Sequence, residues 1–350
     1  MFIGLGLGSK TPAGIHRNTL EVLKELDKII TNNQCEVLIP VNETIDYSFT
    51  NIKVIQIGNV NSRWSRFVWK NVIIQKYLRK KNAVSIDLLL VFPIKVSDII
   101  SLYDCIPEYT PENYKSLKQK FKRWKLIKIQ KRQLKKCKKI ITDSNYAKNQ
   151  IIEFYHIPED KINVVYCSWQ HFLRITEDDK ILERLGLGKY QYYFSLGSRF
   201  PHKNVKWITK AAEKNPNEQF IVSGQYSSFV DTSFEGEIPS NMKFCGYLSD
   251  QEVKSLMHYC KAFIQPSFFE GFGIPPMEAM SVGANCIVSN RASLPEVYKD
   301  SVWYIEPDDY ENIDFGKIMA TPKQSNKSIL DAYSWEKSAK ELLKYISELP

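Results

Sequence analysis

The stretch from Ala262 to Met280 constrains the fold of this chain more than any other part of its sequence. A short apolar run that ends at Pro266 predicts a buried strand, and Gly271 and Gly273 predict a tight loop after it. Two consecutive prolines follow, and proline is favoured in the first turn of a helix because its φ angle is already helical. The stretch therefore predicts a strand, a glycine loop and a helix N-terminus in direct succession.

This junction predicts a binding site for an anion. The first amides of a helix have no carbonyl partner within the helix, and the helix dipole adds partial positive charge at the same end. The amides that we expect to be available are those of Gly271, Phe272, Gly273 and Ile274, together with that of Met277. A phosphate group suits such a helix start.

Two carboxylates flank the loop, Glu270 immediately before it and Glu278 in the first helical turn. One alternative is a solvated loop acid beside an acid that only complements the helix dipole. The surrounding residues favour a specific site, because the run from Glu270 to Met280 resembles the glutamate-x7-glutamate signature of the retaining GT-B glycosyltransferases of family 4. The resemblance implies that Glu278 hydrogen-bonds the ribose of a nucleotide sugar. It also implies that Glu270 and the amides from Phe272 to Ile274 face the transferring sugar and the diphosphate.

Short apolar strands alternate with periodic helices along the chain, and this alternation predicts parallel sheets covered by helices on both faces. At 350 residues the chain is long enough for two domains. The resemblance implies an α/β protein of the GT-B fold, with two Rossmann-like domains facing across a cleft. We expect an acceptor-binding domain at 1–168, a nucleotide-sugar-binding domain at 169–333, and a closing helix within 334–350 that crosses back to the first domain.

Three residues of the first domain are expected to contribute to donor binding. Gly14 lies in a glycine-containing turn expected between the first strand and the first helix, where doubly wound sheets bind ligands, although it can serve the turn alone. Asp104 belongs to a segment similar to the family's His-Asp-x-x-Pro motif, and Tyr103 stands where the family has a histidine near the C6 hydroxyl of the sugar. This departure leads to the hypothesis that the donor is a 6-deoxyhexose or another unusual sugar.

A second anion site is expected in the other domain, after an apolar strand that ends near Gly197. The resemblance implies a basic pair that holds the donor diphosphate. Lys203 matches the family's Lys-Asn step, whereas Arg199 is offset from the usual arginine and His202 occupies its place. Gly246 belongs to a Gly-Tyr-x-Ser-Asp step whose backbone borders the nucleotide base in the family. If Lys203 or Arg199 is considered alone, the alternative is a solvated side chain at the protein surface.

The positive charge of the chain is concentrated in one segment. The net charge is +9, and between Asn113 and Thr142 there are thirteen Lys or Arg residues and no acid. We expect a long helix here, with Leu117, Phe121 and Trp124 in the core and the lysines on an anion-facing surface. Weak attachment to an anionic membrane surface is one interpretation of aromatic and basic residues on one helix, and a solvated face without a partner is the other.

Other sequence features exclude several classes of protein. The seven cysteines are widely spaced and never form a C-x-x-C pair, which predicts neither a disulfide framework nor a structural zinc site. No apolar run reaches the length of a membrane span, and the N-terminus lacks a basic signal region, so we expect a cytoplasmic protein, peripheral at the inner face of the cell membrane. We expect no metal, no cofactor besides the nucleotide-sugar co-substrate, and no nucleic-acid partner, because no RNA-recognition signature is present.

The sequence therefore predicts a hexosyltransferase in bacterial surface polysaccharide biosynthesis. A hexosyl or 6-deoxyhexosyl unit would move, with retention, from a nucleotide-diphosphate sugar to a glycan or a lipid-diphosphate-linked glycan. Lys203, Arg199 and the helix-start amides would stabilise the departing diphosphate, while Glu270 would orient or stabilise the sugar. The alternatives are a non-catalytic protein that binds nucleotide sugars or nucleic acid, and a GT-B phosphorylase or epimerase. The reaction products distinguish these classes.

Overall fold

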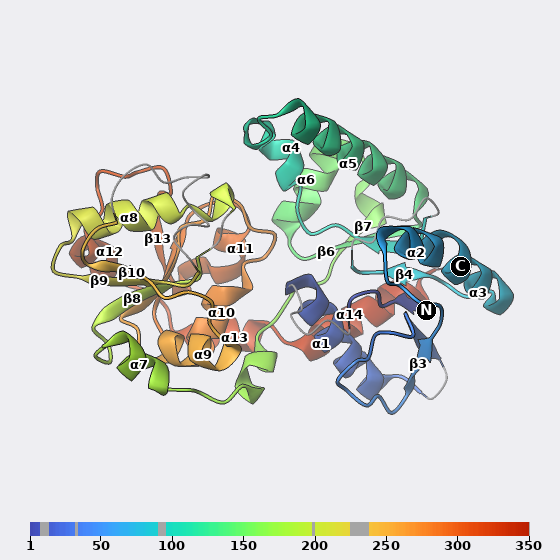
Figure 1. Cartoon of the computed structure of the whole chain (residues 1–350), viewed down its shortest axis with the longest axis horizontal. Coiled ribbons are helices and arrows are strands. Elements are labelled where there is room, and N and C mark those ends of the chain that lie inside the picture. The colour runs from blue at the N-terminus through green and yellow to red at the C-terminus, as the bar shows by residue number, and fades with distance from the viewer. Residues whose placement is uncertain (8–13, 32–33, 90–95, 198–199, 225–237, 350) are drawn as a thin grey trace. The chain divides into compact units, whose positions relative to one another are not determined.

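The chain divides into two compact units, each an α/β structure built on one parallel sheet (Figure 1). Unit 1 comprises Met1–Cys167 and Trp335–Pro350, and unit 2 comprises Ser168–Ser334. The computed structural model describes residues 1–7, 14–31, 34–89, 96–197, 200–224 and 238–349.

The described residues of unit 1 form a seven-stranded sheet in the order β3-β2-β1-β4-β5-β6-β7, and every neighbouring pair is parallel. Its strands are short, rich in β-branched residues and largely buried, as expected for a sheet covered on both faces. They are β1 (Phe2–Ile3), β2 (Cys35–Ile39), β3 (Ile52–Gln56), β4 (Ile86–Asp87), β5 (Ile99–Ser101), β6 (Lys139–Thr142) and β7 (Ile162–Val164).

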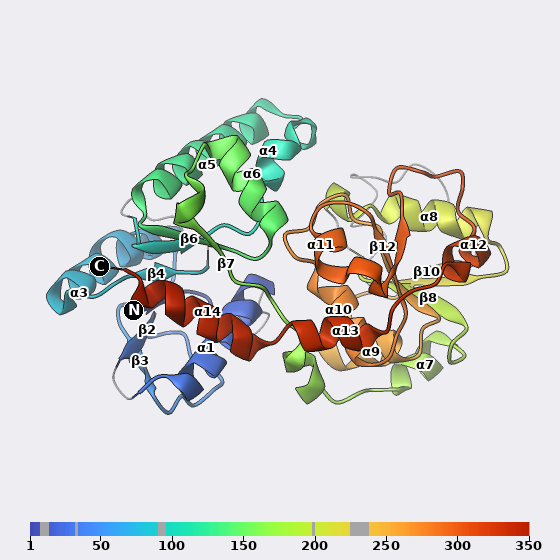
Figure 2. The ribbon, with the colours of Figure 1, turned by 180° about the vertical axis from the view of Figure 1, so that it is seen from behind.

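Helices connect these strands, and a helix from the far end of the chain joins them. They are α1 (Gly14–Ile29), α2 (Arg63–Val68), a π-helical turn (Trp69–Ile73), α3 (Ile74–Lys81), α4 (Ile106–Tyr109), α5 (Leu117–Lys136), α6 (Asn145–Tyr155) and α14 (Trp335–Ser347). The last of these packs beside α1 (Figure 2). It buries Trp335 and Leu342, and Ser338 Oγ donates a hydrogen bond to the carbonyl oxygen of Tyr166. The chain thus returns to unit 1 after completing unit 2.

Two expectations for unit 1 are wrong. Gly14 is the first residue of α1, so the segment 14–17 is helical and does not form the expected turn. On α5, Leu117, Phe121 and Trp124 are 86%, 63% and 53% exposed, and do not lie in the core. The residues that α5 buries are in its second half, among them Leu134. Helical periodicity identified one face of α5, but the sheet is contacted by a different part of the helix.

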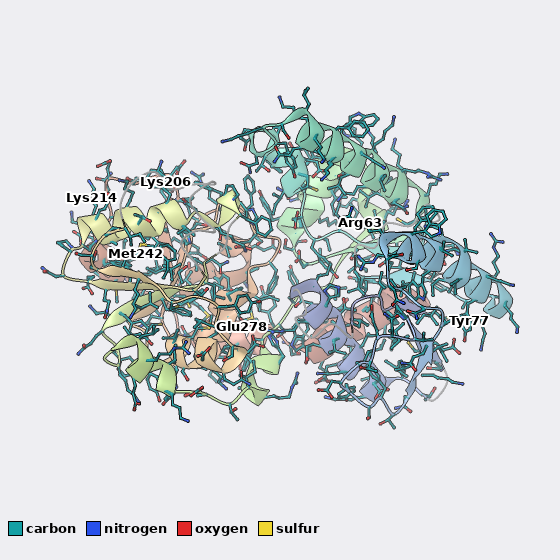
Figure 3. The ribbon with its side chains drawn as sticks, viewed as in Figure 1. Arg63, Tyr77, Lys206, Lys214, Met242 and Glu278 are labelled. Carbon is teal, nitrogen blue, oxygen red and sulfur yellow. The ribbon has the colours of Figure 1, made fainter. Side chains whose placement is uncertain are left out.

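The described residues of unit 2 form a six-stranded parallel sheet in the order β10-β9-β8-β11-β12-β13. The strands are β8 (Tyr192–Ser195), β9 (Gln219–Val222), β10 (Met242–Phe244), β11 (Ala262–Gln265), β12 (Cys286–Ser289) and β13 (Trp303–Ile305). The helices are α7 (Lys180–Leu185), α8 (Val205–Lys214), α9 (Asp250–His258), α10 (Ile274–Ser281), α11 (Leu294–Tyr298), α12 (Phe315–Ala320) and α13 (Asn326–Ala332). Figure 3 labels Lys206 and Lys214 on α8 and Met242 on β10.

Aromatic residues dominate one side of the unit 2 core. The Tyr193 ring stacks on Phe220 and on Phe315, with ring centroids 5.3 and 4.3 Å apart, and Trp207 meets Phe315 edge to face. Burial of a large apolar side chain contributes about 1.5–3 kcal/mol, so these rings anchor α8 and α12 on the sheet. These contacts pack both helices on the sheet whose strand β11 precedes the late glycine loop, residues 271–273.

Candidate functional site

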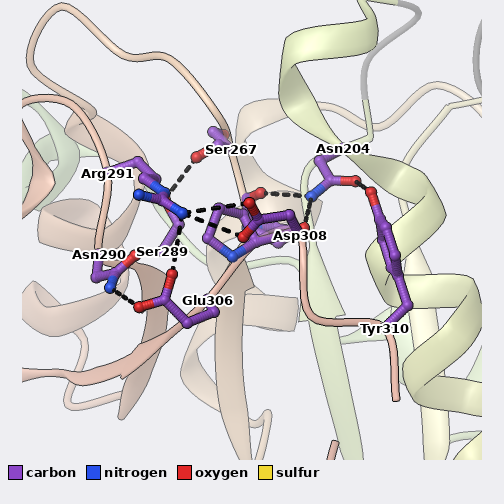
Figure 4. Close-up of polar contacts among 10 residues, drawn as sticks. Asn204, Ser267, Ser289, Asn290, Arg291, Glu306, Asp308 and Tyr310 are labelled. Atoms are coloured by element: carbon purple, nitrogen blue, oxygen red, sulfur yellow. Dashed lines mark hydrogen bonds and ion pairs between the residues drawn. The ribbon is translucent and has the colours of Figure 1, made fainter. Parts of the chain in front are cut away.

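The carboxyl ends of the parallel strands in unit 2 meet at one edge of the sheet, and polar contacts join the loops that follow them (Figure 4). After β11, the carbonyl of Ser267 accepts a hydrogen bond from Ser289 Oγ at the end of β12. Asn204 Nδ2 donates to the carbonyls of Pro266 and Pro307, at 3.0 and 2.7 Å. These bonds hold the loops after β8, β11 and β13 against one another.

Lys203 and Glu270 form a close ion pair within this set of loops. Lys203 Nζ donates to both carboxylate oxygens of Glu270, at 2.7 and 2.8 Å, and Gln265 Nε2 donates to Glu270 Oε1 at 3.0 Å. Glu270 is only 9% exposed, so its charge depends on these two partners for compensation. The pair forms across 67 residues of sequence because β8 and β11 are neighbours in the sheet.

The glycine loop leads into α10 through Gly273, which has a φ of +83°. The buried hydroxyl of Tyr298 donates to the carbonyl of Gly273 and accepts a hydrogen bond of 3.1 Å from the amide of Met277. The expectation that the Met277 amide is available is therefore wrong, because a buried amide requires an acceptor and Tyr298 provides it. Within the described part of the chain, the amides of Gly273 and Ile274 have no hydrogen-bond acceptor. Of the amides expected at this helix start, those of Gly273 and Ile274 are therefore candidates to bind an anion.

Glu278, which Figure 3 labels, is held on α10 by a histidine from the start of unit 2. Nε2 of His171 lies 2.7 Å from Glu278 Oε1, and both side chains are buried. His171 belongs to a short 3₁₀ helix, Gln170–Arg174, which precedes the first strand of unit 2. The contact spans 107 residues, and no local sequence pattern could have indicated it.

Two predicted glycines lie at the same edge of the unit 2 sheet. The amide of Gly197, after β8, donates to Ser223 Oγ at 3.0 Å. Gly246, after β10, exchanges backbone hydrogen bonds of 2.7 and 3.0 Å with Gly224. Its φ of +75° is in the left-handed region that glycine tolerates best, and the next residue, Tyr247, is 88% exposed. The loops after β8, β9 and β10 are thus tied together at this edge.

The positive charge of this loop comes from Lys203 and not from the neighbouring His202. Burial, with a further contribution from the positive charge of Lys203, lowers the pKa of His202 to about 4. His202, which stands where the resembled family has an arginine, is therefore neutral at pH 7 and supplies no positive charge. Arg199, the other predicted cation, lies outside the described residues.

The remaining predicted residues lie in unit 1. Tyr103 is half-buried, its hydroxyl donates to the carbonyl of Leu88 at 3.3 Å, and burial raises the pKa of its phenol. Asp104 Oδ1 accepts a hydrogen bond of 3.1 Å from the amide of Ile106 at the start of α4. Gly14 begins α1. Lys203, Glu270, the glycine loop and Glu278, by contrast, are gathered in unit 2.

Two general properties hold across the described ranges of the chain. No group of three His, Cys, Asp or Glu side chains there could hold a metal ion. No helix there is long and apolar enough to cross a membrane. Independence from metals remains a prediction.

The two units define the class of fold. Over nearly their full lengths, the chain is similar to sucrose-phosphate synthase from Thermosynechococcus elongatus, with a TM-score of 0.74, 13% sequence identity and coverage of 99% of this chain and 98% of that one. It is also similar to Anabaena HepE in complex with UDP and glucose, with a TM-score of 0.69, 14% identity and 99% coverage of each chain. The predicted GT-B fold is confirmed by this architecture. At these identities, the structural similarity establishes the fold alone.

Sequence comparison adds a family match for part of the chain. Residues 177–316 match the family described as glycosyl transferases group 1. O-antigen chain mannosyltransferase B from Escherichia coli is 28% identical over 257 residues, which are 68% of this chain and 65% of that protein. O-antigen chain mannosyltransferase RfbU from Salmonella typhimurium is 29% identical over 222 residues, 62% of this chain and 59% of that protein. The similarity thus spans less than two thirds of the length of either relative.

Proposed function

We propose that the protein is a retaining glycosyltransferase that moves a hexosyl unit from a nucleotide-diphosphate sugar to a glycan or a lipid-diphosphate-linked glycan. The observation that carries the proposal is the contact between Lys203 and Glu270 beside the start of α10. A cation, a carboxylate and helix-start amides suit a reaction in which a diphosphate departs and positive charge develops on the sugar. The two relatives named for O-antigen chains support a role in bacterial surface polysaccharide biosynthesis. We propose the cytoplasm, at the inner face of the membrane, as the place of this reaction.

The proposed work of the site is to stabilise the leaving diphosphate. Lys203 Nζ already donates to Glu270, and a bound diphosphate would share the same N–H donors. The amides of Gly273 and Ile274 would bind a second diphosphate oxygen at the N-terminus of α10, and Arg199 would add a further cation. Because negative charge on the diphosphate increases as the glycosidic bond breaks, these groups bind the transition state more tightly than the donor. On this proposal no divalent metal is needed.

The two acids have different proposed roles. Glu270, with Lys203 on both of its oxygens, faces the transferring sugar and orients it or stabilises its developing charge. Glu278 binds the ribose, and His171, which is bonded to Oε1, leaves Oε2 to accept a hydroxyl. The backbone of Gly246 borders the base, and we retain Gly14, Tyr103 and Asp104 as donor contacts.

We infer that the transferred sugar is mannose, because the relatives of this chain include several proteins named mannosyltransferases. The position of Tyr103 favours a second candidate, a 6-deoxyhexose, since this residue replaces the histidine that contacts the C6 hydroxyl in the resembled family. Turnover of nucleotide-linked mannose and of its 6-deoxy counterpart separates the two. A clear preference for the 6-hydroxy donor excludes the second candidate.

The decisive experiment is an assay of glycoside and free nucleoside diphosphate, using a panel of nucleotide sugars and a lipid-linked glycan acceptor. We expect Lys203→Ala and Glu270→Ala each to lower kcat by a factor of about 10²–10³, the usual effect of removing a group that stabilises charge in the transition state. Glu278→Ala should mainly raise the KM for the donor. Lys210→Ala, which removes an exposed lysine of α8 paired with Glu213, is the matched control and should leave turnover unchanged.

Several outcomes contradict the proposal. If Lys203→Ala and Glu270→Ala both transfer sugar at the unaltered rate, the site is assigned wrongly. Nucleotide-sugar binding without any product identifies a binding protein, and a sugar phosphate or an epimer identifies a phosphorylase or an epimerase. Activity that is lost with a chelator and restored by a divalent cation excludes the metal-independent mechanism.

A further inference from the structure

The first half of α5 presents apolar side chains to solvent. Leu117, Phe121 and Trp124 are 86%, 63% and 53% exposed, and their spacing of four and three residues places them on one face of the helix. The rings of Phe121 and Trp124 stack with centroids 5.7 Å apart. Large exposed apolar residues gathered in one place indicate an interaction surface more often than isolated ones do.

The same face of α5 is strongly basic. The thirteen Lys and Arg residues between Asn113 and Thr142 include Lys120, Lys125 and Lys128, which are exposed beside the apolar stripe. Lys128 Nζ lies 4.6 Å from the centre of the Trp124 ring. Among the described residues, no ion pair involves a lysine or arginine of α5. Arg123 donates to the carbonyls of Pro107 and Glu108, and the exposed lysines Lys120, Lys125 and Lys128 are available to an anionic partner.

A second helical segment of unit 1 has the same character. From Arg63 to Lys81 there are seven Lys or Arg residues and no acid. Trp64 and Phe67 on α2 are 72% and 41% exposed, and their rings stack with centroids 5.6 Å apart. Val72, in the π-helical turn, is 56% exposed. Aromatic and basic side chains are thus combined again.

Both segments cover the same face of the unit 1 sheet. The connections from β3 to β4 and from β5 to β6 run in the same direction along the strand order, and parallel crossovers are right-handed. Figures 1 and 2 accordingly show α3 and α5 on the opposite side of the sheet from α1 and α14. We call the surface formed by the exposed side chains of Arg63–Lys81 and Leu117–Lys136 the basic aromatic face.

We propose that the basic aromatic face binds the surface of a lipid bilayer that contains anionic lipids. Lysine and arginine side chains are attracted to the negative headgroup layer, and tryptophan and phenylalanine are suited to the boundary between headgroups and acyl chains. Phe121 and Trp124 insert at this boundary, with the lysines around them on the headgroups. A nucleic acid would match the charge, but it would leave the leucine and valine of this face without a role. The proposal does not depend on the identity of the sugar or on turnover.

The test is co-sedimentation of the full-length protein with vesicles of phosphatidylcholine alone or mixed equally with phosphatidylglycerol. We expect binding to the anionic vesicles only, weakened by salt because exposed charges are screened. Phe121→Ser with Trp124→Ser, and separately Lys120→Glu with Lys125→Glu, should each lower the affinity by about tenfold or more. Thermal unfolding of every variant verifies that the substitutions leave the fold intact.

Matched controls come from unit 2. Lys206→Glu with Lys214→Glu makes the same charge change on α8, and Leu173→Ser removes an apolar residue that is 57% exposed. Both should bind vesicles as the unaltered protein does. Equal losses in the α5 variants and these controls would overturn the proposal, as would vesicle binding unaffected by Phe121→Ser with Trp124→Ser. Binding of RNA but not of anionic vesicles would overturn it in favour of a nucleic-acid surface.

Discussion

At the scale of single residues, the pairing of Lys203 with Glu270 makes a specific energetic prediction. Lys203→Met would leave the carboxylate of Glu270, which is 9% exposed, with only Gln265 as a described side-chain partner. We expect a loss of about 2–4 kcal/mol in the free energy of unfolding, because an uncompensated buried charge is costly. Combining it with Glu270→Gln should recover part of the loss, and urea unfolding of the double-mutant cycle measures the coupling.

The control for that cycle is the exposed pair Lys210–Glu213 on α8, whose side chains are 37% and 40% exposed. Lys210→Met should change the free energy of unfolding by less than about 1 kcal/mol, as is usual for solvated ion pairs. If the coupling energy between Lys203 and Glu270 is no larger than in this control, the prediction that burial strengthens the contribution of this pair to stability is wrong.

His202 makes the stability of the protein dependent on pH. Because the pKa of this imidazole is lowered to about 4 from an ordinary value of 6.5, the unfolded chain binds a proton in a range where the folded chain does not. The contribution of neutral His202 to the free energy of unfolding is therefore complete above pH 6.5, and it is lost as the pH falls toward about 4. His202→Gln should therefore unfold with a weaker dependence on pH over this range, measured by thermal unfolding.

A suitable control for the histidine is His156→Asn. His156 is exposed at the end of α6 with a φ of +53°, a conformation that asparagine also tolerates. The thermal unfolding of the His156→Asn variant should depend on pH in the same way as that of the unaltered protein. An equal flattening of the pH profile in both variants would show that the effect does not come from the environment of His202.

At the scale of elements, the start of α10 depends on one hydroxyl. Tyr298→Phe removes the group that joins the amide of Met277 to the carbonyl of Gly273, and leaves a buried amide without its acceptor. We expect a loss of about 1–3 kcal/mol in the free energy of unfolding, the usual cost of an unsatisfied buried group. The glycine loop should also become less ordered, so the KM for a nucleotide sugar should rise more than kcat falls.

Tyr304→Phe provides the comparison on the neighbouring strand β13. The Tyr304 hydroxyl is buried and has no hydrogen-bond partner within the described part of the chain. Removing it should leave the free energy of unfolding unchanged or raise it slightly. If the two variants lose the same stability, the bridge made by Tyr298 is not what holds the loop.

At the scale of the whole molecule, α14 makes unit 1 dependent on the last residues of the chain. Leu342 on α14 is fully buried, so Leu342→Ala should cost about 2–5 kcal/mol in unit 1. Hydrogen exchange read by mass spectrometry should show lost protection in peptides from 1–167 and retained protection in peptides from 168–334. Glu341→Ala, at an exposed position beside it, should change neither. Loss of protection confined to 168–334 would be the contrary result.

The sequence by itself determined the class of fold and the local form of the late glycine loop. Alternating strands and helices can bury their apolar faces only in parallel sheets with helices on both sides, and the prolines after Gly273 start α10 where local geometry requires it. These features depend on residues close together in the chain. They can therefore be recognised from spacing alone.

Tertiary structure decided which groups meet and which faces are covered. The contacts of His171 with Glu278 and of Tyr298 with Met277 join different helices, so no local pattern encodes them. The apolar stripe on α5 shows a second limit of prediction from sequence. Periodicity places Phe121 on a helix face, but burial of that face requires a neighbouring element to pack on it, and the free energy of that packing belongs to the whole fold.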